Sequence, residues 1–169
     1  EVARVGASQQ VMLEVKIAEV SKKWLRMRDT YGIEVAADNR AVAARCPLLV
    51  LAIKPQLAAI VLESYRPFVD GRHLVISIMA GVSLRSLAAA FEVPVRLIRV
   101  MPNTPSLVLA GASAYSANAQ ATAEDRNRAT RLLSAVGTCI EVPEHLLNAV
   151  TGLSGSGPGY VFTFIEAMI

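Results

Sequence analysis

The sequence has few cysteines and no long apolar run, and these two features exclude several classes of protein. Only two cysteines, Cys46 and Cys139, occur in 169 residues, and they do not have the spacing of metal ligands. We expect both to be free thiols, which is typical of a reducing compartment such as the cytoplasm. No apolar run approaches the roughly 18 residues of a membrane span, and we therefore expect no membrane association.

Charge is also modest. The formal net charge is +3, and the basic residues are spread along the chain rather than gathered into a patch. Such a distribution is typical of a solvated surface and predicts no nucleic-acid partner. Hydrophobic residues, by contrast, make up 53% of the chain, which is enough for a globular core.

Motifs for catalysis by side chains are missing as well. The segment 152–156 (GLSGS) departs from the G-x-S-x-G nucleophile elbow at its last position. Neither His73 nor His145 has an acid spaced to orient it, so we expect both to be structural or solvated. The G-x-G-x-x-G pattern that binds dinucleotides is absent after every predicted strand. We therefore predict no catalytic side chain and no metal site, and a reaction carried by a cofactor that the protein positions.

Strand and helix patterns alternate over most of the chain. Apolar runs predict strands at 48–53, 73–78, 95–101, 112–116 and 138–142. Apolar stripes and capping patterns predict helices at 41–45, 55–65, 83–91, 122–135 and 143–150. This rhythm predicts an α/β fold with a doubly wound parallel sheet, in which ligands bind at the carboxyl ends of the strands.

The stretch Thr151–Tyr160 (TGLSGSGPGY) is rich in glycine and serine and runs into an apolar segment. Glycines permit close backbone approach, and Pro158 suits the first turn of a helix. One interpretation is an anion site, in which unpaired N–H groups at a helix start receive a negatively charged ligand. The other is a helix break with capping residues, and composition alone does not separate the two.

Residues 1–30 differ from the rest of the chain in their pattern of apolar and polar residues. Apolar and polar side chains alternate through 10–20, which predicts a half-buried strand. The segment 11–21 (VMLEVKIAEVS) resembles the start of the conserved domain of secretins, the outer-membrane ring proteins of secretion and pilus systems. We treat 1–30 as a separate secretin-like segment, and a secretin-like secretion or pilus component is one alternative for the function.

Four motifs carry a second resemblance. They are, in order, VLAIKPQ at 50–56, VISIMAG at 75–81, RVMPNTP at 99–105 and AVTGLSGSGP at 149–158. Together they resemble pyrroline-5-carboxylate reductase, the last enzyme of proline biosynthesis, over about 31–169. The likeness implies a partial Rossmann-like NAD(P)-binding domain at 31–142, then the start of an all-α dimerisation and substrate domain at 143–169. Members of this family form homo-oligomers through their C-terminal helices.

The resemblance also implies where ligands bind. Hydride would pass from NADPH or NADH to the C=N bond of 1-pyrroline-5-carboxylate, giving L-proline. The residues implied to contact the cofactor are Lys54, Pro55, Ala80, Gly81, Asn103 and Thr104. Those implied to receive the substrate carboxylate are Ser154, Gly155, Ser156 and Gly157. Another NAD(P)-dependent dehydrogenase with a similar two-domain plan is the second alternative.

The chain departs from the family pattern at several points. Met79 stands where a small residue is usual, and we expect its longer side chain to narrow the cleft. Asn148 replaces a usual aspartate, and Gly159 replaces a usual alanine. The family's glycine-rich phosphate turn and its later helices have no counterpart in this sequence. We therefore expect little or no turnover from this chain alone.

Overall fold

The computed structural model of the protein describes residues 38–169, so the secretin-like segment 1–30 lies outside the described residues. The strands are β1 (Leu48–Leu51), β2 (Leu74–Ser77), β3 (Arg96–Met101), β4 (Gly111–Ala117) and β5 (Gly137–Glu141). The helices are α2 (Asn39–Arg45), α3 (Ala58–Tyr65), α4 (Leu84–Ala89), α5 (Ala123–Ser134), α6 (Leu147–Val150) and α7 (Gly157–Ala167). Short turns of 3-10 helix are η1 (Pro55–Leu57), η2 (Arg66–Phe68), η3 (Thr104–Val108) and η4 (Glu144–Leu146). The five strands predicted within the described residues are confirmed, with slightly different bounds, and the strand predicted at 10–20 lies outside these residues.

The described strands form one sheet in the order β1-β2-β3-β4-β5. β1, β2 and β3 are parallel, but β4 pairs antiparallel with β3, and β5 pairs parallel with β4. The predicted Rossmann-like sheet is therefore confirmed as mostly parallel, with one antiparallel pairing between β3 and β4. The physical reason is the connection 102–110 between β3 and β4. It is too short for the helical crossover of about a dozen residues that a parallel neighbour requires.

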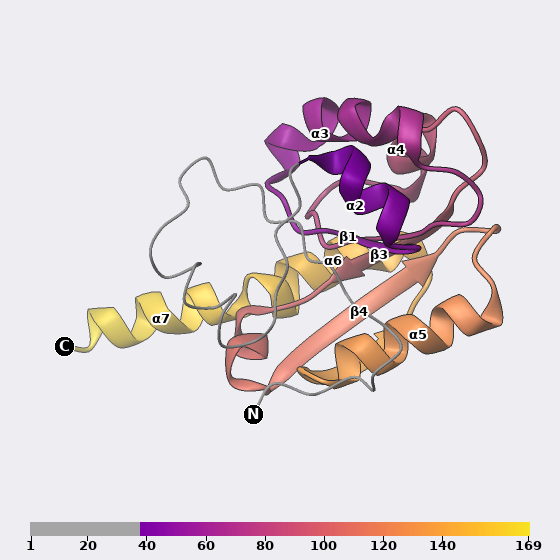
Figure 1. Cartoon of the computed structure of the whole chain (residues 1–169). Coiled ribbons are helices and arrows are strands. Elements are labelled where there is room, and N and C mark those ends of the chain that lie inside the picture. Colours follow the sequence, from indigo (N-terminus) through magenta and orange to yellow (C-terminus); the bar gives the residue numbers. More distant parts are fainter. Residues whose placement is uncertain (1–37) are drawn as a thin grey trace, which may run out of the picture.

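Helices cover both faces of the sheet, and each face has its own core. Figure 1 shows α2, α3 and α4 on one side and α5 on the other. Val75 and Leu97 belong to the core under α2–α4, whereas Ile76 and Ile98 belong to the core under α5. Successive strand residues point to opposite faces, so β2 and β3 supply both cores. This is the layered arrangement expected of a Rossmann-like domain.

Side-chain caps begin two of the predicted helices. The Ser83 hydroxyl accepts a hydrogen bond from the Ser86 N–H at 3.1 Å, at the start of α4. At α5, the Thr122 hydroxyl accepts from the Asp125 N–H, and the Asp125 carboxylate accepts from the Thr122 N–H. The capping start predicted at residue 122 is therefore confirmed as a full capping box.

The thiol and imidazole side chains are placed mostly as expected. Cys46 is buried, whereas Cys139 is only partly buried. His73 is fully buried, and its Nε2 lies 2.9 Å from the Ala43 carbonyl oxygen. His145 is exposed. The two histidines thus fall on either side of the prediction that each is structural or solvated, with His73 buried in the structure and His145 exposed to solvent.

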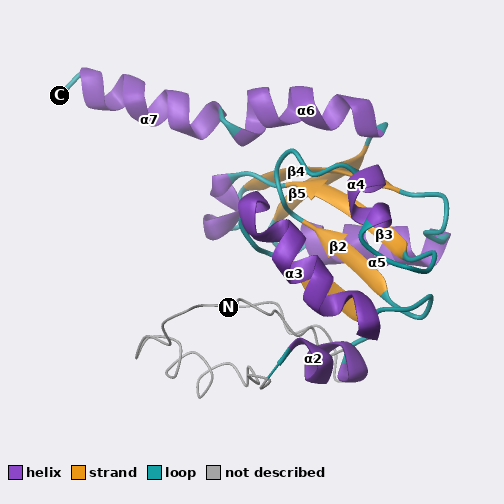
Figure 2. Ribbon diagram, turned by 90° about the horizontal axis from the view of Figure 1, so that it is seen from above, coloured by secondary structure: helices purple, strands orange, loops and turns teal. Residues whose placement is uncertain are grey.

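The glycine-rich stretch continues a helix rather than interrupting one. α6 runs into a turn of π-helix, η5 (Thr151–Gly155), and then through Ser156 into α7. Figure 2 shows these elements as one long helical arm that projects beyond the sheet. The helical path therefore continues through the stretch, although π-helical bonds replace α-helical ones and Ser156 is a turn between η5 and α7. No helix within residues 38–169, this arm included, is long and apolar enough to cross a membrane.

Candidate functional site

The three parallel strands end side by side at one edge of the sheet. Leu51, Ser77 and Arg99 stand opposite one another across β1, β2 and β3. The predicted cofactor residues follow this row a few positions later on each strand, and they are Lys54 and Pro55, Ala80 and Gly81, and Asn103 and Thr104. The sheet register thus sets all three pairs along one edge, where an open α/β sheet binds its ligands.

The turn after β2 is the most open part of this edge. Gly81 has a φ of +76°, and no atom lies within 4 Å of the position that a Cβ would occupy there. Ala80 beside it is exposed, as are Lys54 and Pro55 after β1. A glycine adopts this left-handed conformation without strain and leaves its backbone accessible, so a flat ring could approach the chain closely here.

Asn103 holds the turn after β3 in shape. Its side-chain oxygen accepts a hydrogen bond from the Ala112 N–H at 2.9 Å, and its carbonyl oxygen accepts from the Ser106 N–H at 3.1 Å. The side-chain oxygen therefore joins this turn to the start of β4. Thr104, the first residue of η3, is exposed next to it.

The predicted substrate residues lie beside the end of β3. Gly155 is in van der Waals contact with the chain's own Met101, and a Cβ on Gly155 would collide with the Met101 side chain. Met101 is the last residue of β3 and comes just before the predicted cofactor residues 103 and 104. The structure thus brings the segment 154–157 to the third strand end, which the sequence pattern did not show.

Polar groups of the glycine-rich stretch are engaged within the arm. The Thr151 hydroxyl donates to the Leu147 carbonyl at 2.8 Å, and the Ser154 hydroxyl donates to the Val150 carbonyl at 3.3 Å. The Ser156 hydroxyl and N–H both donate to the Thr151 carbonyl at 2.9 Å. α7 begins at Gly157 with Pro158 in its first turn, as the sequence predicts, and no side chain caps this helix start. The serine hydroxyls are the adjustable donors of the stretch.

Met79 does not narrow the cleft as expected from the family pattern. Its side chain is 1% exposed and belongs to the core under α2–α4, together with Val75 and Leu97. The exposed residues of this turn are the next two, Ala80 and Gly81. The longer side chain fills the protein interior beneath the turn, and the expectation that it would narrow the cleft is wrong.

Three polar side chains connect the arm to the sheet, and of these the sequence pattern had drawn attention only to Asn148, as a departure from the family pattern. Arg99 of β3 is 5% exposed, and its guanidinium donates to Glu144 Oε1 at 3.2 Å and to Asn148 Oδ1 at 3.0 Å. Glu144 Oε1 also accepts from the Leu84 N–H at 2.7 Å. These partners are far apart in the sequence, so no local spacing could have indicated them.

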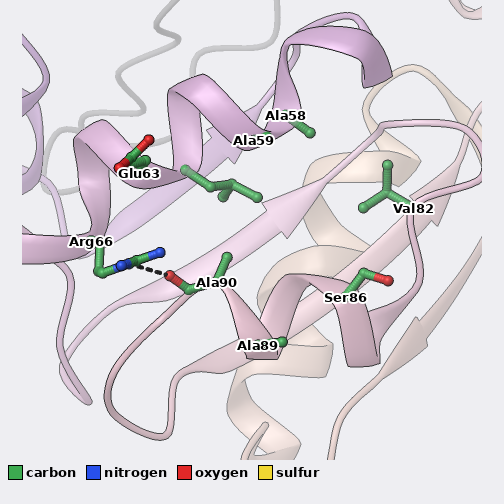
Figure 3. Close-up of a pocket in the computed structure, with 9 residues that line it drawn as sticks. Ala58, Ala59, Glu63, Arg66, Val82, Ser86, Ala89 and Ala90 are labelled. Carbon is green, nitrogen blue, oxygen red and sulfur yellow. Dashed lines mark hydrogen bonds between the residues drawn. The ribbon is translucent and has the colours of Figure 1, made fainter.

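A groove of about 450 Å³ lies between α3 and α4, away from the predicted binding residues. Figure 3 shows Ala58, Glu63 and Arg66 on one wall and Ser86 and Ala89 on the other. The Arg66 side chain closes one end by donating to the Ala90 carbonyl at 3.1 Å. None of the ten predicted binding residues lines this groove.

Comparison with known sequences gives matches over most of the chain. Residues 144–169 match a family described as pyrroline-5-carboxylate reductase dimerisation. The chain is 44% identical over 137 residues to a pyrroline-5-carboxylate reductase of Methanosarcina acetivorans, covering 81% of this chain and 51% of that protein. It is 45% identical over 142 residues to one of a Synechocystis species, covering 84% of this chain and 52% of that protein. The chain therefore spans about half the length of the curated relatives it matches.

Solved structures agree with the sequence matches. A Plasmodium falciparum pyrroline carboxylate reductase with NADP bound superposes with a TM-score of 0.76 at 31% identity, covering 80% of this chain and 51% of that one. A reductase from Coxiella burnetii gives 0.76 at 34% identity, covering 87% and 56%. Prephenate dehydrogenase from Aquifex aeolicus, at 0.62 and 11% identity, shares the fold alone, with 87% and 59% covered.

None of these similarities supports the secretin alternative. The fold is a Rossmann-like sheet that leads into a helical arm, as in the reductases above. Over 81% of its length, the chain is similar in sequence to pyrroline-5-carboxylate reductases, and its arm matches their dimerisation region.

Proposed function

We propose that this chain contributes part of a pyrroline-5-carboxylate reductase, which reduces the C=N bond of 1-pyrroline-5-carboxylate to L-proline with NADPH or NADH. The contact between Gly155 and Met101 carries the proposal, because it sets the predicted substrate turn beside the predicted cofactor turns. The sequence identity of 44% to a reductase supports the same reaction. The reaction would take place in the cytoplasm, a reducing compartment in which protein thiols persist.

The strand ends fit the nicotinamide end of such a cofactor. The left-handed backbone at Gly81 and the open space around it would admit a flat ring. Ala80 would line the same turn, Lys54 and Pro55 would contact the cofactor from the end of β1, and Asn103 and Thr104 would do so from the end of β3. When bound, NAD(P)H supplies the hydride.

Residues of the arm would bind the substrate carboxylate. Ser154 and Ser156 are partly buried, and their hydroxyls donate only to carbonyl groups of their own helix. Rotation about one side-chain bond would redirect each hydroxyl to a carboxylate, where a charge-assisted hydrogen bond is stronger. Gly155 and Gly157 have no side chains, so they would not obstruct the approach of the substrate to this surface. A cyclic imine is already electrophilic, so the chain's own task is to bind and orient it.

The arm would also bind a second copy of the protein. α7 has no buried residue, although most of its side chains are apolar. Its exposed large apolar residues are Tyr160, Val161, Phe162, Phe164 and Ile165, and the exposed Met168 follows directly after the helix. An apolar surface of this extent marks an interaction site, and we propose that the partner is another reductase subunit, as the match of 144–169 to a dimerisation region suggests.

The test combines binding with turnover. Titration of this chain with L-proline, followed by NMR, should shift the amide signals of 154–157 and leave those of the α3–α4 groove unchanged. A second protein would carry residues 38–169 with the remaining segments of the Methanosarcina acetivorans relative. It should oxidise NAD(P)H when 1-pyrroline-5-carboxylate is present and not without it. A folded hybrid that binds NAD(P)H but does not reduce this imine would refute the proposal.

A further inference from the structure

One carboxylate oxygen connects three elements that border the proposed cleft. Glu144 Oε1 accepts from the Leu84 N–H at 2.7 Å and from Arg99 Nη1 at 3.2 Å. Arg99 Nη2 donates in turn to Asn148 Oδ1 at 3.0 Å. Glu144 belongs to η4, Leu84 to α4 and Arg99 to β3, so these contacts join parts of the chain that have no local connection.

Each of these elements leads directly to residues with a proposed binding role. Leu84 begins α4, just after the turn that contains Ala80 and Gly81. Arg99 precedes Met101, the residue that contacts Gly155. Asn148 lies on α6, which continues into the π-helical turn that contains Ser154. The Glu144 carboxylate is therefore bonded to elements that lead to the proposed cofactor turns and, through Arg99, to the helix that leads to the proposed substrate residues.

Burial makes the arrangement sensitive to the charge of Glu144. Arg99 is 5% exposed, and among the described residues its guanidinium forms an ion pair with Glu144, whereas its other side-chain partner, Asn148, is neutral. A buried guanidinium without a counter-ion must regain water or neutralisation. Without the Glu144 carboxylate, Arg99 retains only its contact with Asn148 on the arm, and we expect this weaker attachment to let α6 move away from β3 and separate Gly155 from Met101.

We infer that Glu144 is a positioning residue that fixes the helical arm, through Arg99, against the sheet edge and so sets the distance between the proposed substrate and cofactor turns. The effect of this attachment on the distance between the turns rests on the proposed function, whereas the attachment of the arm to the sheet can be measured without enzyme turnover. Arg99 is the residue of the sheet that Glu144 contacts. The same guanidinium also donates to Asn148 on the arm.

Hydrogen exchange of the full chain, followed residue by residue, tests whether Glu144 holds the arm against the sheet. Glu144→Ala should accelerate exchange of the amides of 147–157 and of Leu84 by about tenfold or more, with the amides of β2 nearly unchanged. The double variant Glu144→Ala with Asn148→Asp returns a carboxylate to Arg99 but not to Leu84. It should restore slow exchange in 147–157 and leave the Leu84 amide fast. Glu124→Ala, which removes an exposed surface ion pair with Arg128, is the control.

A milder variant keeps the test decisive if Glu144→Ala does not fold. Glu144→Gln retains an oxygen for the Leu84 amide but loses the charge, so it should accelerate exchange in 147–157 alone. Unchanged exchange in the Glu144 variants, equal acceleration throughout the sheet, or no rescue by Asn148→Asp would each overturn the inference. In the hybrid reductase, Glu144→Ala should raise the KM for the imine more than it lowers kcat. A hybrid without activity would refute the proposed function and leave the exchange result standing.

Discussion

At the scale of single residues, two glycines differ in whether their position could accept a side chain. Gly137, at the start of β5, has a φ of +148°, and a Cβ there would collide with the backbone of Gly111 on β4. Gly159, within α7, has no atom within 4 Å of the position of a Cβ. The first position tolerates only glycine, whereas the second has a glycine in a helix that would be more stable without it.

Alanine substitution should therefore change stability in opposite directions. We expect Gly137→Ala to lower the free energy of unfolding by about 2 kcal/mol or more, because the clash involves backbone atoms that cannot move aside. Gly159→Ala should raise it by up to about 1 kcal/mol through helix propensity. Urea unfolding followed by circular dichroism would measure both. A similar loss in the two variants would contradict the argument.

Residue roles were predictable only where they depend on local sequence. Gly81 and Pro55 follow apolar runs, so their place at strand ends could be inferred from order along the chain. The contact of Arg99 with Glu144 could not, because it depends on how η4 packs beside β3. Met79 was misplaced for the same kind of reason: its position in the motif did not show whether its side chain enters the cleft or the core.

At the scale of elements, the start of α5 links stability to pH. Burial disfavours the charged form of Asp125, but the Thr122 N–H and hydroxyl and the Arg96 guanidinium outweigh this effect, and the pKa of Asp125 is lowered. A carboxylate with a lowered pKa in the folded protein stabilises the fold above its unfolded pKa of about 3.9. That contribution is lost as pH falls through the folded pKa.

The variant Asp125→Asn tests this linkage. It should lower the free energy of unfolding by about 2 kcal/mol at pH 7, because the capping box and the ion pair with Arg96 are both weakened. It should also flatten the loss of stability that the unmodified protein shows below about pH 4. Urea titrations at several pH values would reveal both effects. Glu124→Gln in the same helical turn is exposed and should change neither.

Whole elements were predicted well where a periodic pattern sets them, as in the strands around Val75 and Leu97. The direction of β4 was not predicted, although the short connection 102–110 was the available signal. The π-helical turn was missed because glycine and serine are typical of breaks. In the folded arm, the Thr151 and Ser156 hydroxyls bond to helix carbonyls, and the arm remains continuous.

At the scale of the whole molecule, the apolar arm should govern association. Replacing Phe162 and Phe164 by serine removes two exposed aromatic side chains from α7. If a second copy covers this surface, the dimer dissociation constant should rise about a hundredfold or more, since burying each ring contributes about 1.5–3 kcal/mol. Sedimentation velocity over a range of concentrations would measure the change.

Exposed apolar residues elsewhere provide the matched control. Leu107 and Val108 of η3 are 84% and 75% exposed, but they lie outside the arm. Serine at both positions should leave the dissociation constant within about threefold of the unmodified value. Equal weakening by the two pairs of substitutions would show that association does not depend specifically on α7.

The spatial order of the strands has a consequence for how the protein is made. The described strands stand in the sheet in the order in which they leave the ribosome, so each new strand meets its neighbour already synthesised. No pairing among them has to wait for a distant segment, which favours folding during synthesis. The arm is made after these strands, and Leu147 of α6, which is fully buried, packs against β3 and β4 once they have been synthesised. Gly155 therefore reaches Met101 only after both strands beside β3 are in place.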